Sequence, residues 1–457
     1  MKNCNFSKLL TLFSILFFFE MYNSYQLFAS EDTLKTSQLS VENCVTRVLL
    51  NNPDIEAAKQ RIEQARSRFA QAQSTKKITM DTDLGYLMGD TPSAYLFKHI
   101  DARKLAPTTD FNNPGRFSAL EWGLTAKYNV LDGGKKKHLT GQAQNSLLSQ
   151  EEEHKIVINN LVGAVIQTYF SILAAKEYVI VVKKSLTTIE SQLKEVEIRS
   201  ETGGALQSDV LTIQVRLARG EESLISAENG VAIAKSALRQ LLDLDPTTAI
   251  TLSGQEWTPA KIPATLEECL TEAMTYRPEI KAINMQILAQ KEAIGLAKSG
   301  KEPDLNLFGR YSLTDDGAHL EMNRDNWTIG AQVNFNIFDG GKKEGTINEA
   351  KSGLTELQAR LRASKRQIEV ETHKAWLTLG EARTREKVAT INSERAEESL
   401  TIVREQYESG LVTVTRYLQS EDDRTNSLFR SIKSIYDIKK AKAALGNAIG
   451  YCVKYAR

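Results

Sequence analysis

A seven-residue segment occurs twice in this chain of 457 residues, and this repetition constrains the fold more than any other feature of the sequence. Residues 130–136 read VLDGGKK and residues 337–343 read IFDGGKK, an offset of 207 positions. The same offset relates Gly203 to Gly410, with no insertion in between. Self-similarity at a fixed offset is typical of a chain built from repeated units. The sequence therefore predicts an internal tandem duplication.

The two halves differ in length near their beginnings. NPDI at 52–55 matches RPEI at 277–280 at an offset of 225, so the first half carries 18 additional residues before its DGG segment. We place them at about 90–116, where three prolines predict an irregular loop. The predicted organisation is a first half over 31–245, a linker over 246–264, a second half over 265–450 and a tail over 451–457.

Residues 1–30 have the layout of a secretory signal. Lys2 and Lys8 precede an apolar run over 9–19, and a polar region with small residues near Ala29 follows. The run is too short to span a bilayer. We expect this segment to be removed and the mature protein to lie outside the cytoplasm.

Long stretches without proline predict long helices. All nine prolines lie at or before Pro303, and both 135–202 and 342–409 lack one. At ~1.5 Å per residue each stretch would form a helix of about 100 Å. Apolar residues at spacings of three and four, such as Leu186, Ile189 and Leu193, indicate coiled-coil-like packing.

A second, shorter helix is expected after each long one, over 207–242 and 414–449. Gly203, Gly204 and Gly410 permit the tight turns between them. The result is two antiparallel helix hairpins.

Residues 161–175 are apolar enough to suggest a transmembrane helix. The counterpart segment 368–382 contains Glu369, Glu371 and Lys374. Since equivalent positions of two repeats share one environment, we predict that 161–175 packs against protein and not lipid.

The membrane signal lies in four alternating segments, 78–89, 120–131, 304–314 and 327–338. Each has about the 9 to 11 residues of a tilted membrane strand, with one apolar and one polar face. Four aromatic residues are expected at the membrane–water interfaces: Trp122, Tyr128, Trp327 and Phe335. Six residues are expected to form the turns from strand to long helix: Asp132, Gly133, Gly134, Asp339, Gly340 and Gly341.

Four strands cannot close a barrel, and an open sheet edge in lipid leaves unpaired backbone groups costing several kcal/mol each. The chain must therefore oligomerise if these strands lie in a membrane. Two chains would give eight strands, whose interior side chains fill, whereas three chains would give twelve strands and a lumen.

Several motifs together resemble the TolC-type outer-membrane efflux proteins. The two DGG segments resemble the family's LFDGG signature, and GGALQSDVL at 203–211 resembles its helix-hairpin signature. NPDI, RPEI and FNNPG at 111–115 are also similar to family motifs, so the resemblance covers about 35–450.

The resemblance implies an α+β membrane protein: a homotrimer with a twelve-stranded β-barrel in the outer membrane, four strands from each chain, continuous with a long α-helical coiled-coil-like barrel across the periplasm. It implies a periplasmic adaptor protein and an inner-membrane pump as partners, and contact with outer-membrane lipid. The implied function is a passive exit channel for efflux or type I secretion, opening at the hairpin tips.

A candidate periplasmic gate follows from the same resemblance. In the family an acidic residue six positions after the hairpin glycine tends to take part in tip contacts. The first half has Asp209 there, whereas the second has Arg416. We predict that Asp209 and Arg416 pair, with Tyr407 as a possible hydrogen-bond partner; the alternative is that both are solvated helix-face charges.

Other functional classes find little support. With 58 Lys+Arg against 57 Asp+Glu, the chain is not a basic nucleic-acid binder. The histidines, His99, His138, His154, His319 and His373, lack metal-ligand spacing, and no nucleophile motif or phosphate loop is apparent. We therefore expect no enzyme activity, no cofactor and no metal, and we expect Cys44, Cys269 and Cys452 to be buried thiols.

Two alternatives to a channel remain at this stage. A trimeric outer-membrane scaffold would use the barrel only as an anchor, without transport. A soluble periplasmic adaptor would leave the alternating strands unexplained. The sequence leaves open which substrate a channel would carry.

Overall fold

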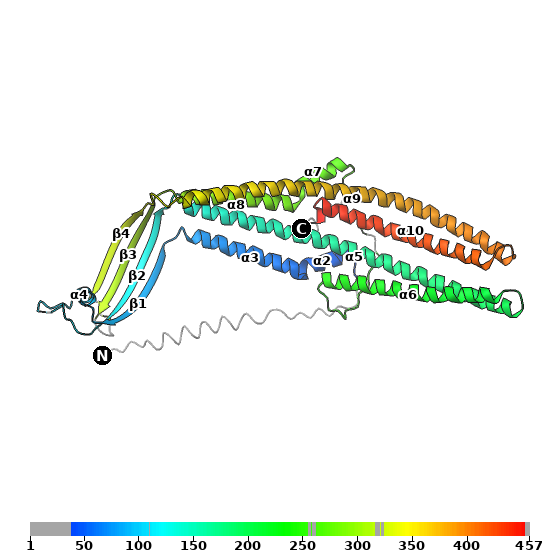
Figure 1. Cartoon of the computed structure of the whole chain (residues 1–457), viewed down its shortest axis with the longest axis horizontal. Coiled ribbons are helices and arrows are strands. Elements are labelled where there is room, and N and C mark those ends of the chain that lie inside the picture. Colours follow the sequence, from blue (N-terminus) through cyan, green and yellow to red (C-terminus); the bar gives the residue numbers. More distant parts are fainter. Residues whose placement is uncertain are drawn as a thin grey trace.

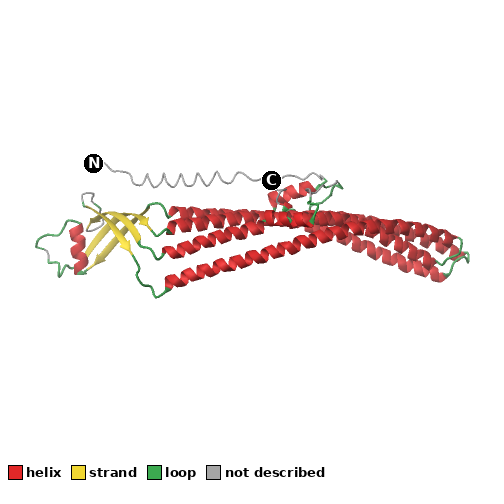
Figure 2. Ribbon diagram, turned by 90° about the horizontal axis from the view of Figure 1, so that it is seen from above, coloured by secondary structure: helices red, strands yellow, loops and turns green. Residues whose placement is uncertain are grey.

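The computed structural model describes residues 38–108, 110–254, 257, 262–315, 320 and 324–452. The predicted signal segment, part of the predicted linker, His319 and most of the predicted C-terminal tail lie outside these residues. The molecule is elongated, with a β-sheet at one end and long helices that extend away from it to the other (Figures 1 and 2).

The two halves contain helices of matching length. The first half has α2 (Val41–Asn51), α3 (Pro53–Ser74), α5 (Lys135–Glu201) and α6 (Gln207–Leu241), and the second has α7 (Leu266–Tyr276), α8 (Pro278–Ser299), α9 (Lys342–Glu408) and α10 (Val414–Ala448). In this order the lengths are 11, 22, 67 and 35 residues in both halves. The strands and the first half's additional helix α4 (Pro92–Asp101) lie between these helices in the chain.

The sheet has four antiparallel strands in chain order: β1 (Thr79–Gly89), β2 (Phe117–Leu131), β3 (Asp304–Asp315) and β4 (Asp325–Asn334). The central pairing of β2 with β3 joins the two halves. β1 and β4 are edge strands, and each pairs on one side only within the chain.

Two details differ from the sequence predictions. β4 ends at Asn334 and not at 338, because Asn334 already pairs with Asp304, the first residue of β3, and Pro303 before it has no N–H to continue the ladder. The additional segment at 90–116 is not entirely irregular. Pro92 opens α4, since the first position of a helix needs no N–H donor.

Local sequence explains where the helices begin. The Asn52 side chain accepts a hydrogen bond from the Asp54 N–H (2.9 Å) just before Pro53, and Thr265 forms a reciprocal capping box with Glu268. Gly134, with φ +86°, precedes α5 in the left-handed conformation that glycine adopts without strain.

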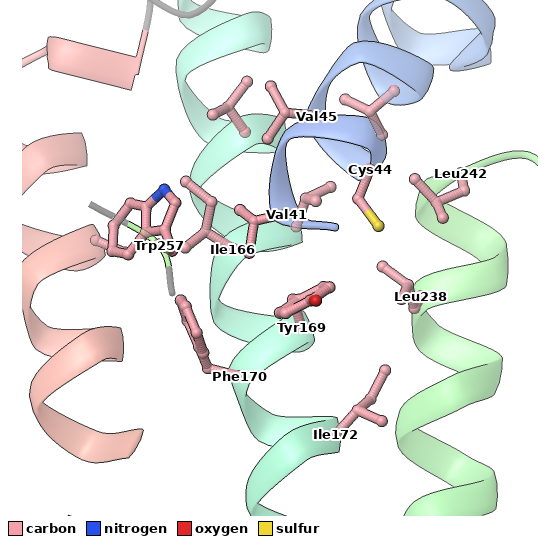
Figure 3. Packing of buried hydrophobic residues seen from close by; sticks show 14 of the residues in the cluster. Val41, Cys44, Val45, Ile166, Tyr169, Phe170, Ile172, Leu238, Leu242 and Trp257 are labelled. Atoms are coloured by element: carbon pink, nitrogen blue, oxygen red, sulfur yellow. The ribbon is translucent and has the colours of Figure 1, made fainter. Parts of the chain in front are cut away.

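The main hydrophobic core surrounds the apolar part of α5 (Figure 3). Ile166, Tyr169 and Phe170 are almost completely buried and belong to one cluster with Cys44 of α2 and Leu238 of α6. Among the described residues α5 is also the one helix long and apolar enough to cross a membrane by length and composition. In this structure its apolar segment packs against other helices, and burial raises the pKa of the Cys44 thiol to about 12.

A second, smaller core lies in the other half, between α7, α9 and α10. It includes Cys269, Ile368, Leu379 and Leu445. Cys44, Cys269 and Cys452 are all buried, free thiols.

Candidate functional site

The two hairpin turns lie at the end of the molecule farthest from the sheet (Figure 1). Gly203 has φ +76° and Gly410 has φ +72°, so both adopt the left-handed conformation that ends a helix. The N–H after each glycine donates to a carbonyl five residues earlier, at 2.7 Å for Gly204 and 2.8 Å in the second hairpin. In each turn, therefore, a single glycine needs a positive φ angle, Gly203 in the first and Gly410 in the second. Gly204 does not have a positive φ angle.

Two tyrosines pack between the hairpins near these turns. Tyr407 of α9 and Tyr417 of α10 stack with ring centroids 5.1 Å apart and planes 6° from parallel. The Gln192 amide of α5 donates to the Tyr417 hydroxyl (2.8 Å), which donates to Glu421 (3.3 Å). The Arg199 guanidinium of α5 lies 5.7 Å from the Tyr407 ring. Burial, and then the Glu421 carboxylate, raises the pKa of Tyr417, so this hydroxyl stays protonated at neutral pH.

An ion pair also joins the two hairpins. Both terminal nitrogens of Arg216 in α6 donate to the carboxylate of Asp422 in α10, at 3.0 and 2.8 Å. Arg216 also donates to the Leu418 carbonyl (2.7 Å), and its side chain is only 13% exposed. A bidentate arginine–carboxylate pair restricts orientation as well as distance. These contacts hold α6 against α10.

A groove of about 740 Å³ lies between α5, α6 and α10, and both Arg216 and Asp422 line it. The groove therefore lies beside the ion pair, between the two hairpins.

The predicted gate residues occupy the same end of the molecule. Asp209 lies in the first turn of α6, and the Arg416 N–H is capped by the Thr413 hydroxyl in the first turn of α10 (3.4 Å). Within the described part of one chain, no ion pair or hydrogen bond joins the Asp209 carboxylate to the Arg416 guanidinium. Tyr407 contacts Tyr417 and Arg199, while burial first, and then acidic residues including Asp209, raise its pKa. The Asp209–Arg416 pair stays a prediction.

The two DGG turns have the same geometry. Asp132 accepts hydrogen bonds from the N–H groups of Gly134 (3.0 Å) and Lys136 (2.8 Å). Asp339 accepts from Gly341 (3.0 Å) and Lys343 (2.9 Å) in the same pattern. Gly133 and Gly340 have positive φ as well. Each aspartate therefore caps the start of a long helix as the chain leaves the sheet.

The sheet has one polar and one apolar face. On the polar face the register aligns Asp81, Thr125, Arg310 and Thr328 across the four strands. Most apolar-face side chains of the edge strands are exposed, including Met80 (66%) and Ile329 (79%). Several apolar residues depart from the alternation, among them Phe308, which lies on the polar face, aligned with Lys127 and Gly330.

The four predicted interfacial aromatics are in different environments. Trp122 packs edge-on against Tyr311 with centroids 6.3 Å apart, and Tyr128 lies under the Lys136 ammonium. Trp327 is exposed on β4, whereas Phe335 is exposed beyond the end of that strand.

Sequence reasoning missed the residues that join the hairpins: Gln192, Arg216, Tyr417 and Asp422. A signal was present, because these contacts occur where the halves differ. At the offset of 207, Tyr417 corresponds to Val210 and Asp422 to Val215. Where one repeat has a polar or aromatic residue and the equivalent position of the other repeat has valine, the polar or aromatic residue is expected to make a contact that the other repeat lacks.

No group of three or more His, Cys, Asp or Glu residues able to hold a metal ion occurs in the part of the chain that the structure describes.

The sequence matches the family described as "Outer membrane efflux protein" over residues 44–243 and 269–451. It is 24% identical over 313 residues to the solvent efflux pump outer membrane protein SrpC of Pseudomonas putida, a match covering 66% of this chain and 62% of that protein. It is 20% identical over 350 residues to the outer membrane efflux protein BepC of Brucella suis, covering 76% and 75%. The chain thus spans less than two thirds of the length of SrpC.

Solved structures show the same fold. The outer membrane channel CmeC of Campylobacter jejuni superposes with a TM-score of 0.79 at 17% identity, covering 93% of this chain and 90% of that one. The open-state MtrE channel of Neisseria gonorrhoeae gives a TM-score of 0.74 at 15% identity, covering 94% and 95%.

The family match covers both halves of the chain and includes both DGG turns and both hairpins, which confirms the resemblance deduced from those motifs. This chain belongs to the outer membrane efflux protein family, whose members are channels of the outer membrane and not enzymes.

Proposed function

We propose that three copies of this chain form the outer-membrane exit channel of a tripartite efflux or type I secretion system. Twelve strands, four from each copy, would close a barrel in the outer membrane, and α5, α6, α9 and α10 would continue it as a helical tunnel across the periplasm. Substrates would pass passively, delivered by an inner-membrane pump through a periplasmic adaptor.

The single observation that carries this proposal is the sheet with two open edges and an exposed apolar face. β1 and β4 each present unpaired backbone groups on one side within the chain. Their apolar side chains, such as Leu84 (67% exposed) and Trp327 (72% exposed), are mostly uncovered by protein in the single chain. In lipid such edges must be paired, and pairing β1 of one copy with β4 of the next closes the sheet.

The helices support assembly in the same way. α6 exposes Ile225 and Ile233, and α9 exposes Val370, Leu377 and Val388. Both helices lie at the outside of the single chain. Exposed apolar residues at such positions indicate packing against neighbouring copies. A 67-residue helix of about 100 Å is long enough to extend far beyond a bilayer.

We also infer that the chain arose by tandem duplication. The equal helix lengths of the halves and the identical capping pattern at Asp132 and Asp339 support this origin. Each copy would then contribute two similar hairpins to the tunnel, so that a trimer has six.

The test is to extract the protein from outer membranes in mild detergent, measure the mass of the particle, and reconstitute the same preparation in a planar bilayer. A three-chain particle with discrete conductance steps is the expected result. A particle of another size would contradict the trimer. A trimer that stays silent even with its tip contacts removed would instead indicate an outer-membrane scaffold without transport.

A further inference from the structure

Three carboxylates and three cationic groups form a network of ion pairs on the polar face of the sheet, in which four charges are linked through Arg310, while Lys127 makes a separate pair with Asp81. The carboxylates belong to Asp81 and Asp83 of β1 and Glu121 of β2, and the cations belong to Lys98 of α4, Lys127 of β2 and Arg310 of β3. Every one of these charges has a partner of opposite sign in the network. Each chain therefore carries a balanced set of charges on this part of the face.

Arg310 is the centre of the network. Its two terminal nitrogens donate to the two oxygens of Asp83 (2.8 and 2.8 Å), and further bonds reach Glu121 (3.0 Å) and the Thr125 hydroxyl (3.0 Å). Lys98 also binds Glu121, and Lys127 lies 3.6 Å from Asp81. The guanidinium therefore connects β1, β2 and β3 and neutralises the two carboxylates together with Lys98.

A glycine makes this position possible. Arg310 lies flat over Gly123 of β2, where an added Cβ would be 2.3 Å from a guanidinium nitrogen. Glycine inside a strand weakens it, and a close approach of another group is a common reason for its presence. Gly330, the counterpart at the offset of 207, is covered in the same way by Phe308, whose ring would be 2.4 Å from an added Cβ. Two β3 side chains are thus held close to the sheet instead of projecting from it.

We infer that Arg310, seated on Gly123, sets the charge preference of the pore by balancing Asp83 and Glu121 on its wall. This inference rests on the proposed function, in which the polar face lines the lumen. Charged side chains along a pore wall select ions by sign, and a low-dielectric wall concentrates their field. With the network balanced, the strand region passes ions of both signs with little preference. Without Arg310, each chain would present one uncompensated negative charge.

The experiment measures reversal potentials in planar bilayers under a KCl gradient. All variants carry Arg216→Ala and Asp422→Ala, a change that is neutral in net charge, so that the helix tips do not limit the ion flux. Arg310→Gln is expected to raise the ratio of potassium to chloride permeability about three- to tenfold near 0.1 M salt, where the screening length is ~10 Å. At 1 M salt, with a screening length of ~3 Å, most of the difference should disappear.

Two further variants separate charge from position. Glu121→Gln removes one negative charge from the same network and is expected to shift the preference toward chloride, which also provides a test should Arg310→Gln fail to fold. Gly123→Ala keeps every charge but displaces the guanidinium into the lumen, so conductance should fall while the permeability ratio stays within about twofold of its starting value. Arg385→Gln is the matched control, since it loses the same charge about 65 Å along α9 from the sheet.

An unchanged permeability ratio in both Arg310→Gln and Glu121→Gln, in channels that conduct, would overturn the inference and leave the channel itself intact. A ratio that changes equally in Arg385→Gln would also overturn it. Silence of every variant would refute the channel and this inference together.

Discussion

The helices α5 and α9 share their length of 67 residues, their preceding DGG turn and their terminal glycine, yet α5 has 17 buried residues and α9 has 8. The reason is their place in the molecule. α5 packs against α3, α6, α8 and α10, whereas α9 packs against α7, α8 and α10 and has a free side (Figure 1). Two helices of equal length therefore carry different sequences because α5 is central and α9 is at a margin.

The difference explains the apolar segment of α5. Phe170 is completely buried, whereas Leu377, its counterpart in α9, is 58% exposed. The apolar character of α5 is thus explained by its many neighbouring helices, and contact with lipid is not needed to explain it. A hydropathy window cannot distinguish burial among helices from contact with lipid. Comparison with the polar counterpart segment 368–382 can, because equivalent positions of the two halves lie either both in the membrane or both outside it.

The largest effect should come from deleting a side chain in this core. Phe170→Ala is expected to destabilise the protein by about 3 to 5 kcal/mol, because it removes a buried ring and leaves a cavity. Leu377→Ala is the matched change at the counterpart position; it should cost below about 1 kcal/mol in a dissociated chain and more in the trimer, where we propose that a neighbouring copy covers this side of α9. Thermal unfolding in detergent measures both. An equally small cost of Leu377→Ala in the trimer would contradict the packing of this side of α9 against a neighbouring copy.

The next largest effect should come from the residue that precedes the first proline of each half, Asn52 before Pro53 and Arg277 before Pro278. The Arg277 side chain donates to the Ala448 carbonyl at the end of α10 and pairs with Glu279 and Glu371, while Asn52 donates to the Leu241 carbonyl at the end of α6. Both side chains satisfy a helix C-terminal carbonyl, but Arg277 also neutralises acidic groups.

We therefore expect Arg277→Ala to cost about 2 to 4 kcal/mol and Asn52→Ala about 1 to 2 kcal/mol. Unfolding temperatures of the two variants, measured side by side, provide the test. The reverse ranking would show that the first half depends more on this contact than the second half does.

A smaller effect is expected where the two hairpins meet. Arg216→Ala or Asp422→Ala removes a bidentate pair whose arginine is mostly buried and whose aspartate is exposed, worth about 1 kcal/mol, which would raise the ratio of open to closed tips about fivefold. Single-channel recordings should show more frequent opening in each variant. The double variant should add little to either single variant, because both remove the same contact. Fully additive effects would indicate that the two residues act separately.

The predicted Asp209–Arg416 gate is tested by Arg416→Glu. If the two residues pair across the tips, reversing one charge replaces attraction by repulsion, and resting conductance should rise by a few-fold, consistent with about 0.5 to 1 kcal/mol for a surface pair. Arg416→Gln serves as the control that removes charge without repulsion. Unchanged conductance in Arg416→Glu would reject the gate and leave both residues as solvated charges.

The smallest effect concerns a histidine present in only one half. Burial first, and then Lys59 and Lys155, lowers the pKa of His154 in α5, and its Nε2 atom has no hydrogen-bond partner. Because the folded protein binds this proton less readily than the unfolded chain, stability should fall as pH drops below the unfolded value of about 6.5.

His154→Leu introduces the residue that the second half has at this position, Leu361. It should reduce the loss of stability between pH 7.5 and 5.5 by less than about 1 kcal/mol, since the site is partly exposed. Melting temperatures across this pH range measure the change. An equal or steeper acid dependence in the variant would exclude His154 as its source.

The predicted hairpins and strands depended on local signals. Proline positions, glycine turns and alternating polarity act within a few residues of the backbone, which is why the long helices at 135–202 and 342–409 correspond closely to α5 and α9. The predicted end of β4, at 338, lies four residues beyond the observed end at Asn334. A strand ends where its partner strand ends, and β3 begins at Asp304, which pairs with Asn334. The helix α4 was missed because Pro92 was interpreted as a breaker, although at a first helical position it favours a helix.

The sequence alone determined the family, the four strands with their polar and apolar faces, and the placement of both hairpin turns, since each depends on motifs and periodicities encoded locally. Only the tertiary structure decided which long helix is central, which residues join the hairpins, and that Arg310 lies on Gly123 beside Asp83 and Glu121. These contacts join residues far apart in the chain, about 190 to 230 positions in the network on the sheet. No local pattern in the sequence specifies contacts between residues so far apart in the chain, because these contacts form only when the strands of the two halves pair.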